Sequence, residues 1–156
     1  VVTVRPFNTY GPHQSARAVI PTIISQALKS DTIKLGALSP QRDMTYVSDT
    51  VQGFITAAVT EKIEGETINL GVGKTATIGE IADTIFDIMG KKIEIISDEN
   101  RVRPEKSEVL KLISNNQKAK NLLDWEPTIS LRDGLEQTIR HIEKNIDKYN
   151  TDTYII

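Results

Sequence analysis

The chain has 156 residues, of which 38% are hydrophobic and 26% charged, and 19 Lys and Arg stand against 21 Asp and Glu for a net charge of −2. This composition is typical of one folded domain with a real core, and it excludes disorder and a strongly basic nucleic-acid-binding domain. The sequence has no Cys, which excludes a disulfide framework and a catalytic thiol, and its apolar stretches are far shorter than the roughly 20 residues of a membrane span. We therefore expect a cytoplasmic protein that binds neither nucleic acid nor membrane.

The chain opens with Val1-Val2-Thr3-Val4, a β-branched run typical of a strand that is buried on both faces. Such a strand needs a neighbour on each edge, and no initiator Met or leader precedes it. We expect its partner strands to lie upstream, and we interpret the 156 residues as the C-terminal segment of a longer protein.

The next elements follow from local pattern. Pro6 and Pro12 predict an ordered loop over Arg5–Pro12 rather than a continuing strand. Apolar residues at helical spacing predict a helix over 19–29, with Pro21 tolerated in its first turn. A short strand is predicted at Ile33–Leu35, and an extended segment at Arg42–Val47.

A second helix is predicted after that extended segment, with Ser48 or Asp49 as its N-cap. Its apolar residues recur at spacings of three and four and are expected to form a buried face: Val51, Phe54, Ile55, Ala58 and Val59. A strand at Thr67–Leu70 follows.

The remaining elements begin with Thr77-Ile78-Gly79-Glu80, a capping box at the start of a helix that runs to Met89 and ends at Gly90. Beyond it the sequence predicts strands at 93–97 and 108–113 around a charged loop, a short helix from Asn115 or Asn116 to Leu123, and a long amphipathic helix capped by Ser130 and extending toward Tyr149. Trp125 is expected to lie in the core.

Two features suggest chemistry but carry weak signals. The turn Gly71-Val72-Gly73-Lys74-Thr75-Ala76 fits a loose form of the dinucleotide fingerprint, yet the capping box leaves Ala76 outside the following helix. His13 and His141 are the only histidines, so a zinc site is not expected. We interpret His141 as a surface residue and His13 as a loop residue that makes a backbone hydrogen bond or lines a site.

Arginine gives a more useful signal. Arg42 follows one loop rich in Gly and Pro, and Arg101 and Arg103 follow another. A guanidinium group is a planar fork that matches phosphate oxygens, so two such loops can clamp a diphosphate without making the protein basic overall. Solvent-exposed structural arginines remain the alternative.

An ordered set of motifs makes the sequence resemble the extended short-chain dehydrogenase/reductase family, in particular its NAD-dependent sugar-nucleotide 4,6-dehydratases and epimerases. The pieces span nearly the whole chain: Arg5-Pro6-Phe7-Asn8-Thr9-Tyr10-Gly11-Pro12, Val19-Ile20-Pro21, Arg42-Asp43 with Tyr46-Val47 and Asp49, Asn69-Leu70-Gly71, Arg103-Pro104 with Ser107-Glu108-Val109, Lys118-Ala119, and Trp125-Glu126-Pro127 with Ser130-Leu131. The Arg-Pro-x-x-Ser-Glu-Val string is most similar to dehydratases acting on UDP-, GDP- or CDP-sugars.

The resemblance implies an α/β fold, with 1–156 as the C-terminal part of an extended Rossmann-type enzyme: a late Rossmann strand plus a small α/β substrate-binding region, without the N-terminal NAD-binding domain. It implies that the substrate, a nucleotide-diphosphate sugar, is bound by the following residues: Asn8, Ala18 and Val19 near the phosphates, Lys34 and Leu35 near the nucleobase, Arg42 and Arg103 on the diphosphate, and Glu108 on the ribose. It also implies a homodimeric parent enzyme.

The sequence departs from the family in two respects, because it has neither a leading glycine-rich βαβ unit nor a Tyr-x-x-x-Lys pair. In the family that tyrosine is the base for hydride transfer to NAD. We therefore expect no catalytic residue in this segment, and binding of the nucleotide part of the substrate without turnover. A non-catalytic binding or assembly module, using the final helix and the tail Tyr154-Ile155-Ile156, is the alternative, and a nucleotide site at Gly71–Ala76 is a weaker one.

Overall fold

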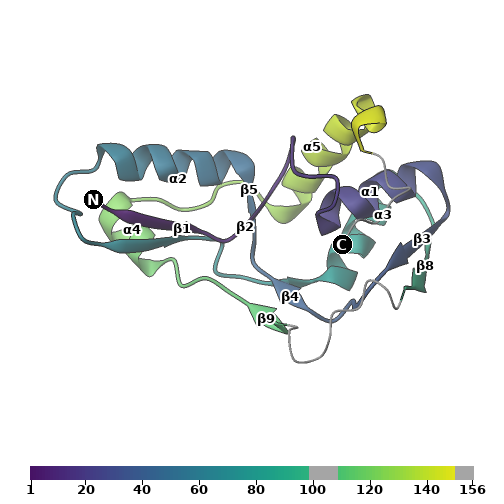
Figure 1. Ribbon diagram of the computed structural model, residues 1–156, viewed down its shortest axis with the longest axis horizontal. Helices are drawn as coiled ribbons and strands as arrows, with labels where there is room; N and C mark the ends of the chain where they lie inside the picture. Colours follow the sequence, from purple (N-terminus) through teal and green to yellow (C-terminus); the bar gives the residue numbers. More distant parts are fainter. Residues whose placement is uncertain (99–108, 150–156) are drawn as a thin grey trace. The chain divides into compact units, whose positions relative to one another are not determined.

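The computed structural model describes residues 1–98 and 109–149, which form a mixed α/β fold (Figure 1). The elements are β1 (Thr3–Pro6), β2 (Asn8–Tyr10), α1 (Val19–Lys29), β3 (Thr32–Leu35), β4 (Gln41–Arg42), β5 (Met44–Tyr46), α2 (Val47–Val59), β6 (Thr67–Leu70), β7 (Ala76–Thr77), α3 (Ile78–Met89), β8 (Glu94–Ser97), β9 (Lys111–Leu112), α4 (Gln117–Leu123), α5 (Leu131–Lys144) and a 3₁₀ turn (Ile146–Lys148). They fall into two compact units.

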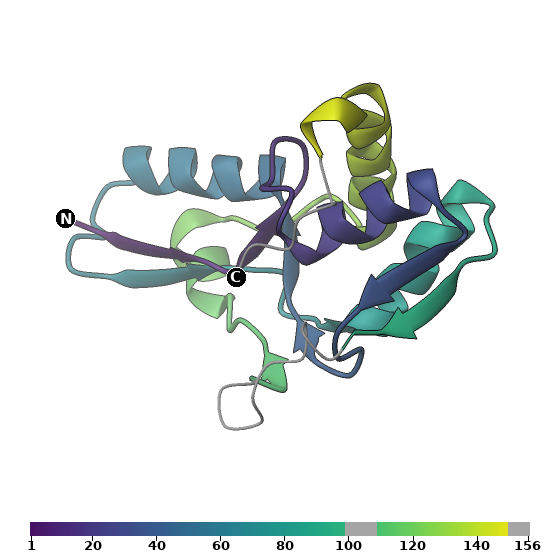
Figure 2. The same cartoon turned by 45° about the vertical axis from the view of Figure 1, so that its right-hand side comes forward.

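The first unit is built from Val1–Tyr10, Gln41–Ala76 and Lys111–Leu131. It holds three parallel strand pairs, β1 with β6, β2 with β5 and β4 with β9. Parallel pairs need crossover connections, and the chain supplies α2 between β5 and β6. Figure 2 shows α2 running along the β1–β6 pair. The core of this unit joins residues of α2, β6 and α4 with the predicted core residue Trp125: Ala57, Ile63, Ile68, Leu70, Ala119, Leu123 and Trp125.

The strand at the start of the chain differs from its prediction. Val2 and Val4 pack against the core of the first unit, but the other face of the strand is exposed, and Val1 is fully exposed. Among the described residues β1 pairs with β6 alone, so one edge has no neighbour. The predicted loop after it also contains a strand, β2, because the backbone of Asn8–Tyr10 pairs in register with β5.

The apolar face of α2 is the second difference, because the sequence predicts it to be buried. Its residues are exposed: Val51, Phe54, Ile55, Ala58 and Val59. The face that packs on the unit instead carries small and polar residues, Asp49, Thr50, Gly53 and Ala57. A Cβ on Gly53 would lie 2.5 Å from Leu70 Cδ1, so the bare glycine is what lets α2 approach β6 closely.

Asp49 does not cap α2 as expected, since the cap position is Tyr46 and has no side-chain capping bond. The Asp49 carboxylate accepts hydrogen bonds from Thr128 Oγ1 at 2.9 Å and from the Ile129 amide at 3.0 Å. Its carbonyl accepts the Trp125 indole N–H at 3.0 Å. Asp49 therefore fastens the segment after α4 to the start of α2.

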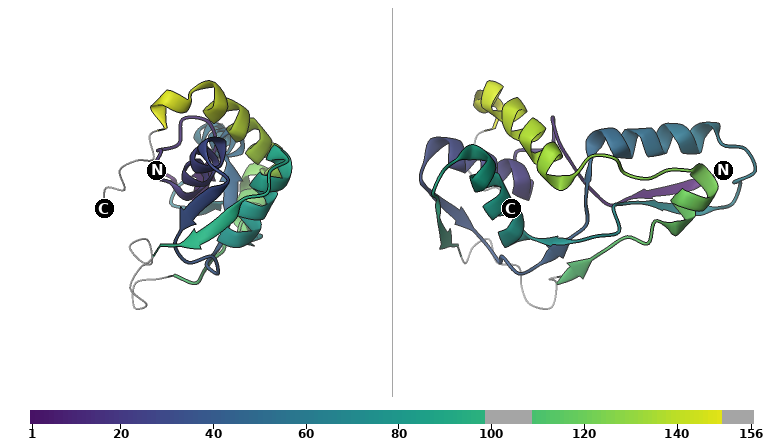
Figure 3. Two further views of the ribbon diagram at one scale, coloured as in Figure 1. Left: turned by 90° about the vertical axis from the view of Figure 1, so that its right-hand side faces the viewer. Right: turned by 180° about the vertical axis from the view of Figure 1, so that it is seen from behind.

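The second unit takes its described residues from 11–40, 77–110 and 132–156. The left-hand view of Figure 3 shows its parallel strands β3 and β8 side by side. Helices α1, α3 and α5 contribute fully buried apolar residues to its core, among them Ile24, Ile85 and Leu135. The period of 3.6 residues that predicted these helices is the same period that buries one side of each.

Local rules set the ends of α1 and α3 as expected. Helix α1 spans Val19–Lys29. At α3 both bonds of the capping box form, from the Glu80 amide to Thr77 Oγ1 at 3.0 Å and from the Thr77 amide to Glu80 Oε2 at 2.7 Å, and Gly90 closes the helix in the left-handed conformation. The hydrogen bond from the Thr77 amide, followed by one with the Thr77 side chain, lowers the pKa of the Glu80 carboxyl.

The last predicted helix is shorter than its pattern. Helix α5 ends at Lys144, and the continuation toward Tyr149 is a single 3₁₀ turn at Ile146–Lys148. The apolar face of α5 is buried within the second unit, where Leu135 and Ile142 are fully enclosed. The Tyr154–Ile156 tail lies outside the described residues.

Candidate functional site

The sequence-predicted site residues divide between the two units. Asn8 and Arg42 belong to the first unit. Ala18, Val19, Lys34 and Leu35 belong to the second. Arg101, Arg103 and Glu108 lie outside the described residues, so the paired-arginine hypothesis stays a prediction.

The structure brings Asn8 and the segment that carries Arg42 together. Both side chains are half-buried. Asn8 lies on β2 and its Nδ2 donates to the carbonyl of Asp43 at 3.3 Å, the residue that follows Arg42. Arg42 ends β4, and its Nη1 donates to the Gln41 carbonyl at 3.0 Å. The guanidinium and the amide thus come from neighbouring backbone of one unit.

Asp43 is a residue whose role the sequence did not reveal, although it stands in the Arg42-Asp43 motif. It interrupts the predicted extended segment between β4 and β5, and it is fully buried. Its carboxylate accepts hydrogen bonds from the amides of Val72 at 2.8 Å, Gly73 at 2.9 Å and Ser114 at 3.0 Å, and from Ser114 Oγ at 2.6 Å. A buried charge is tolerated when it is so fully hydrogen-bonded.

The same bonds explain the glycine turn that resembled a dinucleotide fingerprint. Backbone amides of such a turn bind an anion, and here the anion is the protein's own Asp43 carboxylate, held by Val72 and Gly73. Gly71 leaves room for this arrangement, because a Cβ there would lie 2.3 Å from Ser114 Oγ. The amides that would cradle the pyrophosphate of NAD are therefore already used, and this turn does not fit the cofactor.

Ala18 and Val19 lie where expected, at the start of α1. Ala18 occupies the cap position with no side-chain capping bond, and the first turn of α1 carries no acidic residue. The start of a helix is its positive end and favours an anion. The position suits a phosphate, and a phosphate contact at Ala18 and Val19 stays a prediction.

Lys34 and Leu35 lie on β3, which pairs with β8, and the backbone of Lys34 is also bonded by the side chain of Gln26. The Gln26 side chain accepts a hydrogen bond from the Lys34 amide at 3.0 Å through Oε1, and it donates one to the Lys34 carbonyl at 3.2 Å through Nε2. The Lys34 side chain is exposed, whereas Leu35 is buried in the core. Lys34 can therefore offer its side chain to a nucleobase, and the role of Leu35 stays a prediction.

The two histidines are paired, which the sequence did not indicate. His13 adopts the left-handed conformation, with φ +68°, and its ring centroid lies 4.6 Å from that of His141. His141 is half-buried rather than a surface residue, and it also packs edge-on against Tyr149. Burial, followed by the charges of His13 and Lys148, lowers the pKa of His141.

The buried tyrosines of the first unit lack the features of a catalytic base. Tyr10 and Tyr46 pack edge to face with their ring centroids 5.6 Å apart. Tyr10 donates its hydroxyl to the Leu131 carbonyl at 3.1 Å. Burial raises the pKa of Tyr46, whereas a base near neutral pH needs a lowered value.

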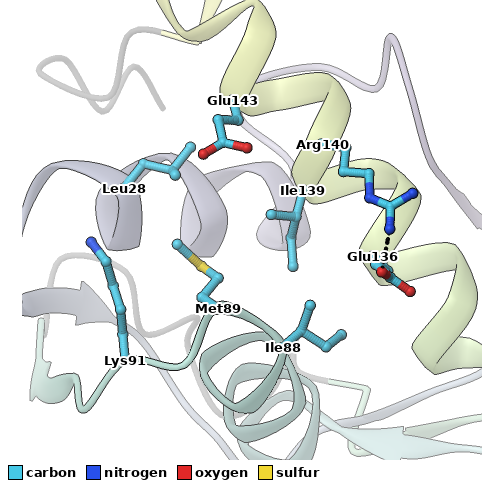
Figure 4. A pocket seen from close by; sticks show the side chains of 8 residues that line it. All are labelled: Leu28, Ile88, Met89, Lys91, Glu136, Ile139, Arg140 and Glu143. Atoms are coloured by element: carbon cyan, nitrogen blue, oxygen red, sulfur yellow. Dashed lines mark hydrogen bonds and ion pairs between the residues drawn. The ribbon is translucent and has the colours of Figure 1, made fainter.

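The described residues also limit other kinds of site. Residues 1–98 and 109–149 contain no cluster of three or more His, Asp or Glu arranged to bind a metal ion, and no helix there has the length and apolarity needed to cross a membrane. A cavity of about 290 Å³ opens in the second unit, and Figure 4 shows its apolar floor and charged rim. Its lining is Leu28, Ile88, Met89, Lys91, Glu136, Ile139, Arg140 and Glu143, which includes none of the predicted site residues.

The parallel strand pairs and the helix α2 that connects β5 to β6 define an α/β protein. A family model described as GDP-mannose 4,6 dehydratase matches residues 1–138. The chain belongs to this family of extended short-chain dehydrogenases/reductases, which confirms the resemblance read from the motifs and the α/β fold class.

Relatives agree with that assignment. The chain is 33% identical over 144 residues to an uncharacterised UDP-glucose epimerase, YtcB, of Bacillus subtilis, a match that covers 91% of this chain and 44% of that protein. It is 32% identical over 149 residues to a UDP-glucuronate 4-epimerase of Thermodesulfobacterium geofontis, with 94% and 44% covered. The chain thus spans less than half the length of these relatives.

A solved structure gives the same picture in three dimensions. The UDP-glucuronic acid 4-epimerase of Bacillus cereus, in complex with UDP-glucuronic acid and NAD, superposes with a TM-score of 0.83 at 32% identity. The match covers 92% of this chain and 45% of that enzyme.

Proposed function

We propose that this chain is the substrate-binding C-terminal portion of an NAD-dependent sugar-nucleotide dehydratase or epimerase, and that it binds the nucleotide-diphosphate part of the substrate. The observation that carries the proposal is the Arg42 segment. A guanidinium and an amide, Arg42 and Asn8, lie on adjacent backbone that a buried carboxylate holds in place. The relatives named for UDP-sugars, and the solved epimerase bound to UDP-glucuronic acid, support a nucleotide sugar as the ligand.

The roles of the individual groups follow from their chemistry. Arg42 presents a guanidinium whose planar fork matches diphosphate oxygens. Asn8 supplies a short polar side chain beside it. Arg103 and Glu108 are proposed as the second diphosphate cation and the ribose acceptor, as their motif predicts.

We also propose that NAD is bound by an upstream Rossmann domain, in a cytoplasmic homodimeric parent. Two observations support an upstream domain. The chain matches less than half the length of its relatives. Among the residues that the structure describes, β1 has one unpaired edge and α2 has an exposed apolar face: Val51, Phe54, Ile55 and Val59. A parallel sheet is normally covered on both faces. When bound, NAD would supply hydride transfer, and this chain's own residues would hold the substrate.

The alternative of an assembly module relied on the final helix and on the tail Tyr154-Ile155-Ile156, and the tail lies outside the described residues. The final helix, on which that hypothesis relied, already buries its apolar face. An assembly role would use the exposed apolar face of α2. The same face would be covered if an upstream Rossmann domain packed on this unit, so it fits both hypotheses.

The test is nucleotide binding by the chain, measured by isothermal titration with UDP, dTDP, GDP and CDP. We expect one of the four to bind, and Arg42→Ala to weaken its binding by about tenfold or more, since a hydrogen bond to a charged group contributes about 1.5–3 kcal/mol. Arg140→Ala is the matched control, because Arg140 pairs with Glu136 on α5 and is exposed. Absence of binding by all four, or equal affinity in Arg42→Ala, would refute the diphosphate assignment.

A further inference from the structure

The buried Asp43 carboxylate connects three separate stretches of the first unit. Its oxygens accept bonds from Val72 and Gly73 in the turn after β6, and from Ser114, two residues after β9. Ser114 Oγ in turn accepts the Gly73 amide at 3.1 Å, which closes the group into a ring of bonds. These donors lie 29 to 71 positions away in sequence, so the carboxylate is a tertiary fastening rather than a local turn.

The backbone of Asp43 is fixed as firmly as its side chain. Its amide donates to the Leu112 carbonyl of β9 at 3.0 Å, and its carbonyl accepts Asn8 Nδ2 at 3.3 Å. Arg42 is the preceding residue, so any rotation of Asp43 moves the Arg42 backbone. The same rotation would release the Asn8 side chain.

We infer that Asp43, locked by Ser114, is a positioning residue that sets the Arg42 guanidinium and the Asn8 amide for diphosphate recognition. This inference rests on the proposed function, since it assigns the residues that orient the proposed binding groups. Preorganised donors bind an anion more tightly because the ordering cost is met during folding. A carboxylate bonded by three backbone amides and a hydroxyl is fixed in direction as well as in distance, which an apolar contact at the same place would not achieve.

The experiment uses Ser114→Ala and Asp43→Asn in the 156-residue chain, titrated with UDP and with uridine; if wild type binds another of the four nucleotides instead, that nucleotide and its nucleoside replace UDP and uridine throughout. Ser114→Ala removes the 2.6 Å hydroxyl donor, and Asp43→Asn replaces a carboxylate oxygen with a donor that faces other donors. We expect affinity for UDP to fall by about fivefold or more in each variant, since each loses a bond to a charged group. Affinity for uridine, which has no diphosphate, should not change.

A double-mutant cycle distinguishes positioning from a general structural role. If Asp43 acts through Arg42 and Asn8, then Asp43→Asn should lower UDP affinity less in the Arg42→Ala background than in wild type, and the remaining loss should come from Asn8. Gly53→Ala is the control for destabilisation, because it crowds Leu70 in the same unit but touches none of the proposed binding groups. It should lower the melting temperature and leave the affinity for UDP unchanged.

Four outcomes would overturn the inference. The first is an unchanged UDP affinity in Ser114→Ala and Asp43→Asn, and the second is an equal loss of uridine and UDP affinity in these variants. The third is additivity of the effects of Asp43→Asn and Arg42→Ala on UDP affinity. The fourth is a loss of UDP affinity in Gly53→Ala as large as that in Asp43→Asn. If wild type binds UDP and Arg42→Ala weakens it, any of these leaves the proposed function standing. Should Asp43→Asn fail to fold, Ser114→Ala decides alone, because it keeps the carboxylate and its three amide donors. If wild type binds none of the four nucleotides, the proposed function and this inference both fail.

Discussion

Gly71→Ala is expected to destabilise the first unit through a clash at the Asp43 carboxylate. A Cβ at position 71 would lie 2.3 Å from Ser114 Oγ, 2.6 Å from Ser114 Cβ and 3.0 Å from Asp43 Oδ2. The Ser114 side chain must leave its place, and its bond to Asp43 breaks. Gly71 is not one of the glycines with positive φ, so this clash alone carries the expected effect.

The magnitude follows from two contributions. Losing a hydrogen bond to a buried charged group costs about 1.5–3 kcal/mol, and overpacking costs about 1–3 kcal/mol. We therefore expect Gly71→Ala to lower the free energy of unfolding by roughly 3–5 kcal/mol. Ser114→Gly removes the hydroxyl and the Cβ, so alone it should cost about 2–4 kcal/mol through the lost bond and added chain entropy.

The double variant Gly71→Ala/Ser114→Gly tests whether Ser114 is the group that excludes a side chain at position 71. Ser114→Gly removes the two closest clashes of the new Cβ and leaves only its 3.0 Å approach to Asp43 Oδ2, so the combined cost should fall short of the sum by at least about 1 kcal/mol. Urea unfolding monitored by Trp125 fluorescence measures it, because the single tryptophan is buried in the same unit. Gly79→Ala is the control, since its Cβ would meet nothing closer than 3.7 Å. Additive costs in the double variant would refute the claim that Ser114 constrains Gly71.

Two further predictions concern packing and pH. Gly53→Ala, with its Cβ 2.5 Å from Leu70 Cδ1, should lower the unfolding free energy by about 1–3 kcal/mol in urea despite better helix propensity, and a stabilised variant would contradict the close packing. Burial, followed by the charges of His13 and Lys148, lowers the pKa of His141 in the folded state. As the pH falls, His141 is therefore protonated first in the unfolded chain, and the stability of the fold decreases from about pH 6.5 down to the folded-state pKa of His141. His141→Gln should flatten that part of a pH–stability profile, and an equally steep profile would contradict it.

Local rules were sufficient for many elements. Helix α1 and the capping box at Thr77 follow from spacing and hydrogen-bond chemistry within a few residues, and the structure has both as expected. The ordered motifs identified the family, and Trp125 lies in the core as the sequence predicted.

Other expectations failed because they depended on what lies next to an element. The apolar residues of α2 have the spacing of a buried face, but burial needs a neighbouring element to cover that face. Among the described residues none does, and Phe54 and Val59 are exposed. Asp49 has the composition of a cap, but distant donors at Thr128 and Ile129 use its carboxylate. No local pattern specifies either outcome.

The amino-acid order alone determined which segments become helices and the family of the chain, and it nominated Arg42 and Arg103 as candidate phosphate-binding arginines, since propensity and motif are properties of neighbouring residues. Tertiary structure alone decided that Asp43 fills the glycine turn after β6 and that Asn8 is fastened beside Arg42. Hydrogen bonds between residues tens of positions apart exist only after the chain has folded, and this is why the residue that holds the proposed site together could not be recognised before its partners were in place.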